Sequence, residues 1–548
     1  MSELIDRARA WAAEDPDDQT RAELEALVEA VRKHPDGEQA ADLADRFDGR
    51  LEFGTAGLRG ALGAGPNRMN SAVVLRAAAG LATYLRSHGA GADATVVVGY
   101  DARHNSEVFA HDTAAVMVGA GMQAVVLPRP LPTPVLAYAI GKLGCVAGVM
   151  VTASHNPPQD NGYKVYLGEG SQIVPPADAD ISAAIDRVSE RDLGEVPRAD
   201  AYRVVGEELL AAYRERVASL VPPGAPRQLR WVYTPMHGVG GALVQSVVAA
   251  AGFPAPRVVG AQAEPDPDFP TLPFPNPEEP GAIDLALTEA ETGETDLVVA
   301  NDPDADRCAV ATVVGGRWRM LTGDELGALL GDDALRRGVQ GTYACSVVSS
   351  SLLSRLAAAA GQPFVYTLTG FKWIGRVPGL AFGYEEAIGY CVDPQAVPDK
   401  DGISALVRVL ALTAALRASG RTLADRLDEI AQVHGVHSTS QLSVRVADLS
   451  LISDAMARLR SAPPSMLAGE PVEVQDLAAG SPELPPTDAV LLSGAATKVV
   501  VRPSGTEPKL KCYLEVREEP TADLAGARQR AQSRLLRVRQ EMSTVLGL

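Results

Sequence analysis

The chain has 548 residues, of which 46% are hydrophobic and 22% charged, as expected for a folded protein with several buried cores. At roughly 150 residues per domain, this length predicts three to five domains. The formal net charge of −19 argues against a nucleic-acid or anionic-membrane surface, because no long run of Lys and Arg offsets it. An anionic substrate would therefore need a locally positive cleft.

The chain's cysteines and apolar runs bear on its compartment. The five cysteines are scattered and form no C-x-x-C pair, which favours a reduced protein over a disulfide or zinc framework. The chain starts with an amphipathic helical pattern, without the apolar core of a signal peptide. No apolar run reaches the roughly 18 residues that a membrane span needs. We therefore expect a cytoplasmic protein with no membrane span.

The predicted elements repeat along the chain. Residues 1–50 predict a helical extension, and from residue 51 apolar strand patterns alternate with helical ones. This alternation is typical of a largely parallel sheet with helices on its faces, and it covers residues 51–205, 206–321 and 322–432. Residues 433–548 instead show amphipathic strands and a long closing helix. We expect three similar α/β domains with mixed, mostly parallel sheets, followed by a smaller C-terminal α+β domain.

The first candidate for chemistry follows the apolar run CVAGVMVTAS, which ends at Ser154. His155, Asn156 and two prolines come next. Open α/β sheets bind ligands beyond the carboxyl ends of their strands, so this loop is well placed for catalysis. A plain Ser/Asn turn closed by proline is the alternative, and this stretch alone does not decide between them.

The second candidate is the acidic loop NDPDADR. Asp302, Asp304 and Asp306 stand at alternate positions and can offer oxygen ligands to one hard divalent cation. A calcium EF-hand does not fit, because Arg307 stands where that loop needs glycine and Val313 where it needs glutamate. A solvated acidic turn is the alternative. However, carboxylates between two apolar strands repel unless a cation compensates, so we expect a metal site.

Three further loops combine glycine with cationic or hydroxyl side chains. FGTAGLRG ends near Arg59, and TGFKWIG presents Lys372 on a glycine turn that opens a helix. The loop VRPSGTEPKLK supplies donors suited to a phosphate, from Arg502, Ser504, Gly505 and Thr506. Each loop alone is a common kind of turn. Their joint occurrence at the ends of predicted strands favours a phosphate-binding protein.

Four motifs in this order resemble those of the α-D-phosphohexomutase superfamily, which includes phosphoglucomutase and phosphomannomutase. TASHNPPQDNGYKVY is similar to its phosphoserine loop, DPDADR to its metal loop, GYEEAIGY to its sugar-binding loop and RPSGTEPK to its phosphate-binding loop. The resemblance covers about residues 51–516. The sequences of the segments FGTAGLRG, TGFKWIG and EEAIGY most resemble those of the phosphoglucomutase-2-like branch, some of whose members act on phosphopentoses.

The resemblance implies an enzyme that interconverts hexose 1-phosphate and hexose 6-phosphate through a phosphoserine and a sugar 1,6-bisphosphate, which is also the activator. Lys164 would be the general acid and base, with its pKa lowered by nearby arginines. The implied catalytic residues are Ser154, Lys164, Arg59 and His155. The implied ligands of one Mg²⁺ are Ser154, Asp302, Asp304 and Asp306. The implied substrate-binding residues are Arg307, Gly370, Lys372, Glu386, Lys400, Arg502, Ser504, Gly505 and Thr506.

The sugar-binding loop departs from the family's usual G-E-x-S-G-H. Glu386 keeps the carboxylate, but Ile388 and Tyr390 stand where serine and histidine are common. This change removes short polar contacts and adds bulk. We expect glucose phosphate to be preferred, with a phosphomannomutase or a phosphopentomutase as alternatives. The expected partners are small phosphosugars, bound by a monomer or a small homo-oligomer.

Two other classes compete with a mutase. Ser154 beside His155 would suit a phosphatase or a serine hydrolase, but no G-x-S-x-G elbow is present, and adjacent side chains on an extended loop are expected to diverge. A non-catalytic sugar-phosphate sensor is the other possibility. The intact serine, Lys164 and the three aspartates argue against it.

Overall fold

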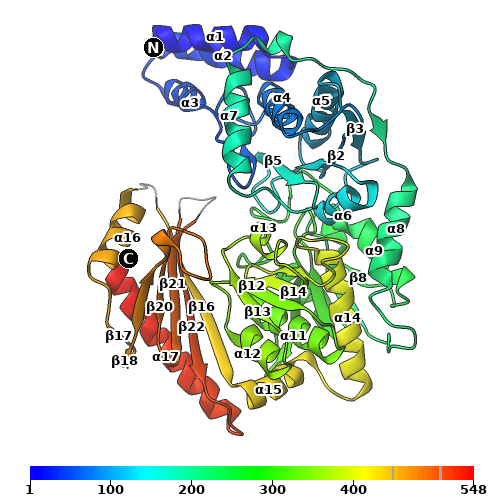
Figure 1. Cartoon of the computed structure of the whole chain (residues 1–548), viewed down its shortest axis with the longest axis vertical. Coiled ribbons are helices and arrows are strands. Elements are labelled where there is room, and N and C mark those ends of the chain that lie inside the picture. The colour runs from blue at the N-terminus through cyan, green and yellow to red at the C-terminus, as the bar shows by residue number, and fades with distance from the viewer. Residues whose placement is uncertain (447–449, 505–508, 548) are drawn as a thin grey trace. The chain divides into compact units, whose positions relative to one another are not determined.

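A computed structural model describes residues 1–446, 450–504 and 509–547 of the chain. Its internal contacts divide the chain into two compact units, which interleave along the sequence (Figure 1). Unit 1 consists of Met1–Gly224, Arg230–Ala309 and Gln395–Val407. Unit 2 consists of Ala225–Leu229, Val310–Pro394 and Arg408–Leu548.

The helical extension opens unit 1. Its helices are α1 (Ser2–Glu14), α2 (Asp18–Lys33) and α3 (Glu38–Arg46). Asp17 caps α2, since its side chain accepts a hydrogen bond from the backbone N–H of Gln19. The three helices enclose a small core of their own that includes Leu24 and Leu43. All three helices lie within residues 1–50, the range for which the sequence predicts a helical extension.

The first α/β layer of unit 1 is a six-stranded sheet in the order β1-β5-β4-β2-β3-β6. Four strands are parallel neighbours: β4 (Ala147–Val151), β2 (Thr95–Tyr100), β3 (Gln123–Val126) and β6 (Arg203–Val204). The hairpin partner β5 (Asp160–Leu167) runs antiparallel to β4, and β1 (Leu58–Ala61) runs antiparallel to β5. The helices of this layer are α4 (Ser71–Ser87), α5 (Ser106–Gly119), α6 (Thr133–Leu143) and α7 (Ala177–Ser189). Because β4 is buried along its whole length, its end delivers Ser154 from a rigid core.

The second α/β layer of unit 1 is built around β7 (Trp231–Thr234). This strand runs parallel to β8 (Arg257–Val258) and to β9 (Leu297–Ala300). Its helices are α8 (Glu207–Ala218), α9 (Gly240–Ala250) and α10 (Asp284–Glu291). The acidic loop begins directly after β9, as the sequence pattern predicts.

The third α/β layer lies in unit 2 and has the strand order β13-β12-β14-β15. The strand β12 (Thr342–Ser346) is parallel to β13 (Phe364–Thr367) and β14 (Leu380–Glu385), while β15 (Gly389–Cys391) is antiparallel to β14. The helices are α11 (Gly323–Arg336), α12 (Leu352–Ala359), α13 (Phe371–Ile374), α14 (Gly402–Ala418) and α15 (Leu423–His434). In the sequence, an antiparallel hairpin comes before this third layer, formed by β10 (Ala309–Val314) and β11 (Arg317–Met320).

The C-terminal domain of unit 2 is an antiparallel sheet covered by helices. Its strands, in spatial order, are β16 (Val436–Arg445), β22 (Lys509–Glu518), β21 (Thr497–Pro503), β20 (Val490–Ser493) and β19 (Glu473–Asp476). A two-stranded ribbon joins β17 (Met466–Leu467) to β18 (Glu470–Pro471). The helix α17 (Leu524–Leu546), red in Figure 1, lies along the sheet beside α16 (Ser450–Ser461). Three mixed α/β layers followed by a smaller α+β domain confirm the predicted fold class.

Two expectations about the chain's surroundings can be compared with the structure. No single helix among the described residues is long and apolar enough to cross a membrane. The helices α14 and α15 reach the length and composition of a membrane span only when they are taken together, and the chain bends by 87° between them. All five cysteines are free and buried.

Candidate active site

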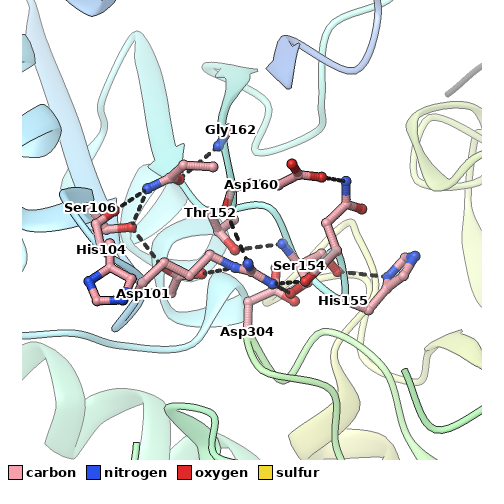
Figure 2. Close-up of polar contacts among 12 residues, drawn as sticks. Asp101, His104, Ser106, Thr152, Ser154, His155, Asp160, Gly162 and Asp304 are labelled. Carbon is pink, nitrogen blue, oxygen red and sulfur yellow. Dashed lines mark hydrogen bonds and ion pairs between the residues drawn. The ribbon is translucent and has the colours of Figure 1, made fainter. Parts of the chain in front are cut away.

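Ser154 lies just beyond the carboxyl end of β4, where a ligand is expected in this type of sheet. Its φ of 51° lies in the left-handed region that residues other than glycine rarely adopt. Its N–H donates to Oγ1 of Thr152 (2.8 Å), and its Oγ donates to Oδ2 of Asp302 (2.9 Å). The residue is only 3% exposed, so its hydroxyl is held in a buried polar cluster (Figure 2).

A single buried arginine binds the backbone of the serine loop. The Nη1 atom of Arg103 donates to the carbonyl oxygens of Pro157 (2.8 Å) and Asp160 (3.1 Å). Its Nη2 atom donates to those of Ser154 (2.7 Å) and Asn156 (2.5 Å). Arg103 and Ser154 are buried and the other three contacts are partly buried, so the guanidinium both satisfies the loop's carbonyls and fixes the loop's shape.

The three aspartates of the acidic loop converge in space. One carboxylate oxygen from each of Asp302, Asp304 and Asp306 lies within 4.8 Å of the others, and each residue is at most 1% exposed. Asn301 closes the loop, because its Nδ2 donates to the carbonyl of Arg307 (2.6 Å). Burial, followed by the charges of its two neighbours, raises the pKa of Asp302 well above its ordinary value.

This cluster fits a divalent cation. The Oδ1 atoms of Asp304 and Asp306 are buried and accept no hydrogen bond from any described residue. The hydroxyl of Ser154 stands within hydrogen-bond distance of the third carboxylate. Buried carboxylate and hydroxyl oxygens are the hard ligands that Mg²⁺ prefers, so the donor set suits that ion.

Lys164 reaches the same cluster from β5. Its Nζ lies 2.8 Å from Oδ2 of Asp304 and 3.3 Å from Oδ2 of Asp306. Burial by itself lowers the pKa of Lys164, but the two carboxylates outweigh burial, and the net pKa is raised. The expected net lowering of this pKa is wrong, because the lowering effect of Arg59 is smaller than the raising effect of the two carboxylates. Lys164 therefore holds its proton in this arrangement.

Two more predicted residues complete the cluster. The Nζ of Lys400 lies 3.3 Å from Oδ2 of Asp306, which brings a residue of the segment Gln395–Val407 to the acidic loop. The backbone N–H of Arg307 donates to Oδ1 of Asp302 (3.0 Å). With Lys164, these groups balance the buried negative charge.

The structure also places Arg59 and His155 beside the serine. The Nη1 of Arg59 donates to Oδ1 of Asn156 (3.1 Å), one residue beyond His155. The Nδ1 of His155 lies 3.2 Å from Oγ of Ser154, so the prediction that these adjacent side chains diverge is wrong. The left-handed turn at the serine brings them together (Figure 2). Burial, then the neighbouring arginines, lowers the pKa of His155 well below its ordinary value, which keeps the imidazole neutral.

The sugar-binding motif lies in unit 2, after β14. The Oε2 atom of Glu386 accepts hydrogen bonds from Oγ of Ser346 (2.9 Å) and Oγ of Ser349 (3.2 Å). Ile388 and Tyr390 are 1% and 0% exposed and belong to the buried core. The expectation that these two residues change the sugar preference stays a prediction.

The predicted phosphate-binding residues of unit 2 lie in two separate segments of the chain. Gly370, with φ of 102°, begins the short helix α13 that carries Lys372. Arg502 is on β21, and the backbone N–H of Ser504 donates to the carbonyl of Lys509 (2.8 Å). Gly505 and Thr506 lie outside the described residues.

Comparison with known proteins agrees with this geometry. Four family models match, described as phosphoglucomutase/phosphomannomutase α/β/α domains I (residues 50–192), II (211–315) and III (322–433) and C-terminal domain (444–528). The chain is 48% identical to the "Probable phosphomannomutase" of Haemophilus influenzae, over 83% of this chain and 94% of that one. It is 36% identical to the phosphoribomutase of Saccharomyces cerevisiae, over 94% and 93%. A phosphoglucomutase/phosphomannomutase family protein from Burkholderia thailandensis shares the fold, with a TM-score of 0.69 at 20% identity over 90% and 97%.

The chain belongs to the α-D-phosphohexomutase superfamily. It is therefore a phosphosugar mutase, an intramolecular phosphotransferase of carbohydrate metabolism.

Sequence reasoning missed three residues of this mutase that the structure brings to the predicted ones. Arg103 follows the end of β2 in the run YDAR, where a charged pair after a buried strand is a readable signal. Thr133 begins α6, and its Oγ1 donates to Oδ2 of Asp304 (2.7 Å). In unit 2, Nζ of Lys498 donates to the carbonyl of Ser349 (2.7 Å), a pairing without any local sequence signal.

Proposed function

We propose that the mutase transfers its phosphoryl group through Ser154, and that mannose 1-phosphate is its preferred hexose substrate. The observation that supports the first part is the hydrogen bond from Oγ of Ser154 to Oδ2 of Asp302, inside a buried cluster of three carboxylates. A serine so placed is beside the cation-binding oxygens and at the end of a rigid strand. A plain loop serine needs neither feature.

The chemistry then follows from the residues present. The phosphorus–oxygen bond to Ser154 breaks as a sugar hydroxyl forms a new bond to phosphorus, first giving the bisphosphate. Lys164 holds a proton and can give it to the released serine oxygen, then recover one from the sugar hydroxyl, so protons balance. A Mg²⁺ held by the three aspartates and Ser154 would stabilise the charge of the transferring group. Return of the other phosphate to Ser154 completes the cycle.

The remaining predicted residues have binding roles in this proposal. Arg59, His155, Arg307 and Lys400 surround the reacting end of the sugar phosphate in unit 1. Arg502 and Ser504, with Lys372, grip the phosphate that is not transferring, because guanidinium and backbone donors suit a phosphate dianion. Glu386 accepts hydrogen bonds from sugar hydroxyls. Its orientation is restrained by Ser346 and Ser349.

The choice of sugar rests on two relatives. The glucose preference expected from the sequence stays a prediction, whereas the relative with 48% identity is named a phosphomannomutase. The yeast phosphoribomutase matches over nearly the whole of both chains, so a pentose phosphate is the second candidate. We further propose a sugar 1,6-bisphosphate as activator, cytoplasmic location, and a monomer or small homo-oligomer.

Parallel kinetics test this ranking. Turnover of mannose, ribose and glucose 1-phosphates is measured with Mg²⁺ and glucose 1,6-bisphosphate, and free phosphate is followed in the same samples. We expect kcat/KM to be highest for mannose 1-phosphate, with ribose 1-phosphate second and no net phosphate release. A higher value for glucose would restore the sequence-based ranking. Stoichiometric release of phosphate would show that the protein is a phosphatase. A neutral His155 beside Ser154 could also serve that reaction.

A further inference from the structure

A proline-rich loop, residues 264–280, lies in the second α/β layer of unit 1 and precedes α10. None of the proposed active-site residues belongs to it. Seven of its 17 residues are proline, whose ring fixes φ and removes the backbone N–H, so few conformations are open to this loop. Such a loop can hold a side chain in one place without a helix or strand around it.

Buried groups of the second layer anchor the loop on both sides of Phe269. The backbone N–H of Asp266 donates to the carbonyl of His237 (3.0 Å). The Oγ1 of Thr271 lies 2.8 Å from Nε2 of His237 and accepts a hydrogen bond from Nε2 of Gln262 (2.9 Å). Phe269 is buried, and its φ of 45° lies in the left-handed region. A phenylalanine keeps that backbone angle only where the surrounding contacts hold it, so its ring has a fixed place.

That ring packs against the arginine that binds the serine loop. The guanidinium carbon of Arg103 lies over the ring of Phe269, 4.9 Å from its centroid. The Nη atoms of Arg103 donate to the four carbonyls of the serine loop, and its Nε lies 3.4 Å from Oδ2 of Asp101. An aromatic ring attracts a guanidinium without accepting those hydrogen bonds, whereas a polar residue in its place would compete for the donors. Phe269 therefore restrains Arg103 and leaves its hydrogen bonds to the serine loop.

The same loop reaches two further cationic groups of unit 1. Oε2 of Glu278 lies 3.7 Å from Nη1 of Arg307, a residue of the acidic loop. Oδ1 of Asp268 lies 2.8 Å from Nε2 of His104, the residue after Arg103. The second pair is largely exposed and contributes little to stability. Together with Phe269, these contacts place the proline-rich loop against the segments that carry Arg103 and Arg307.

We propose that Phe269 is a positioning residue for phosphoryl transfer, and that it acts through Arg103 on the loop of Ser154. The ring keeps the guanidinium where it meets the four carbonyls, and those contacts set the place of the nucleophile. The proposal rests on the proposed function, since it takes Ser154 as the phosphoryl carrier. Loss of the ring lowers kcat more than it changes KM, because a small displacement of a reacting atom slows the chemical step.

The variant Phe269→Leu tests this role, because it keeps an apolar side chain and removes the ring. Dephosphorylated full-length protein is incubated with glucose 1,6-bisphosphate and Mg²⁺, and intact-mass analysis follows the rate and the final extent of phosphoryl gain. We expect this rate and kcat to fall about tenfold, with KM and the final extent of one phosphoryl group per chain unchanged. A lower final extent would reveal partly unfolded protein. In that case Phe269→Met, which fills more of the same space, replaces the leucine variant with the same expectation.

Two comparisons complete the test. Phe274→Leu, at an exposed position of the same loop, is the matched control and should behave as wild type. In an Arg103→Lys background, Phe269→Leu should lower kcat by less than about twofold further, because its effect passes through the guanidinium. A full tenfold loss in that background, or wild-type rates in folded Phe269→Leu, would overturn the positioning role alone. If the wild-type protein gained no phosphoryl group at Ser154, the proposed function would fail, and this proposal with it.

Discussion

The backbone of Ser154 explains how one residue can meet so many groups. A serine in the left-handed region carries a conformational cost of roughly 1–3 kcal/mol, which the surrounding contacts must offset. Here the N–H is bound by Thr152, the carbonyl by Arg103 and the hydroxyl by Asp302. These three contacts therefore offset the conformational cost, and the hydroxyl is oriented before any substrate binds.

A first prediction concerns that hydroxyl. Protein incubated with glucose 1,6-bisphosphate should gain one phosphoryl group by intact-mass analysis, and Ser154→Ala should gain none because it lacks the accepting oxygen. Mutase turnover of this variant should fall to background. Ser87→Ala, an exposed serine on α4, is the control and should behave as wild type. Wild-type turnover in Ser154→Ala would refute the phosphoserine route.

A second prediction concerns the acidic loop. Asp304→Asn removes one carboxylate from the cation site and an ion-pair partner from Lys164, so kcat should fall by at least about 100-fold. Chelation with EDTA should abolish wild-type turnover, and Mg²⁺ should restore it. Asp48→Asn, on the exposed surface, should change neither property. Full activity after thorough chelation would mean that the loop has no catalytic metal.

At the scale of elements, the serine loop is held by a residue from another strand–loop junction. Arg103 follows β2, the strand next to β4 in the sheet, so the sheet itself sets the distance between the arginine and the loop. Charged side chains after buried neighbouring strands can meet in this way without being close in sequence. The motif YDAR indicates that a charged residue follows the strand, but it does not predict that Arg103 donates to four carbonyl oxygens.

The third prediction tests this positioning role. Arg103→Lys keeps the positive charge but loses the guanidinium that reaches four carbonyl oxygens. We expect kcat to fall by about 100-fold with little change in KM, since a small displacement of the nucleophile has that effect. Steady-state kinetics measure both constants, and the melting temperature shows whether the fold persists. Arg129→Lys, an exposed pairing with Glu207, is the control. A rise in KM as large as the fall in kcat would instead indicate that Arg103 contacts the substrate directly.

A fourth prediction concerns α11 and its buried carboxylate. Burial raises the pKa of Asp324 to about 6, although its Oδ1 accepts hydrogen bonds from the N–H of Ser350 (2.6 Å) and the hydroxyl of Tyr384 (2.9 Å). The folded state therefore holds this proton more tightly than the unfolded state. Stability falls as pH rises from about 4 to 6, and above that the buried charge costs up to about 3 kcal/mol.

The variant Asp324→Asn should remove that penalty, because the amide oxygen can keep both hydrogen bonds. We expect its melting temperature to exceed that of wild type at pH 7.5 and the difference to shrink towards pH 4. Thermal unfolding at several pH values measures this. A stability difference between variant and wild type that does not change with pH would contradict a raised pKa at Asp324.

At the scale of the whole molecule, the sequence predicted what depends on local pattern. The three α/β layers follow from periodic apolar runs, and the serine and acidic loops follow from strand ends with polar residues. The pKa of Lys164 could not be read in that way, because it depends on which distant charges are nearest. Neither could the contact between Ser154 and His155, which needs a rare backbone angle. Such properties arise only when segments far apart in the chain meet.

The interleaving of the two units has a consequence for synthesis. Lys400 pairs with Asp306, yet residues 310–394, which belong to unit 2, lie between them in the sequence. At about 5–20 residues per second, a ribosome needs roughly 5–20 s to pass from one partner to the other. During that interval the nascent acidic loop lacks one of its two lysine counter-ions. Unit 1 can therefore reach its final charge balance only after most of the third α/β layer has been translated.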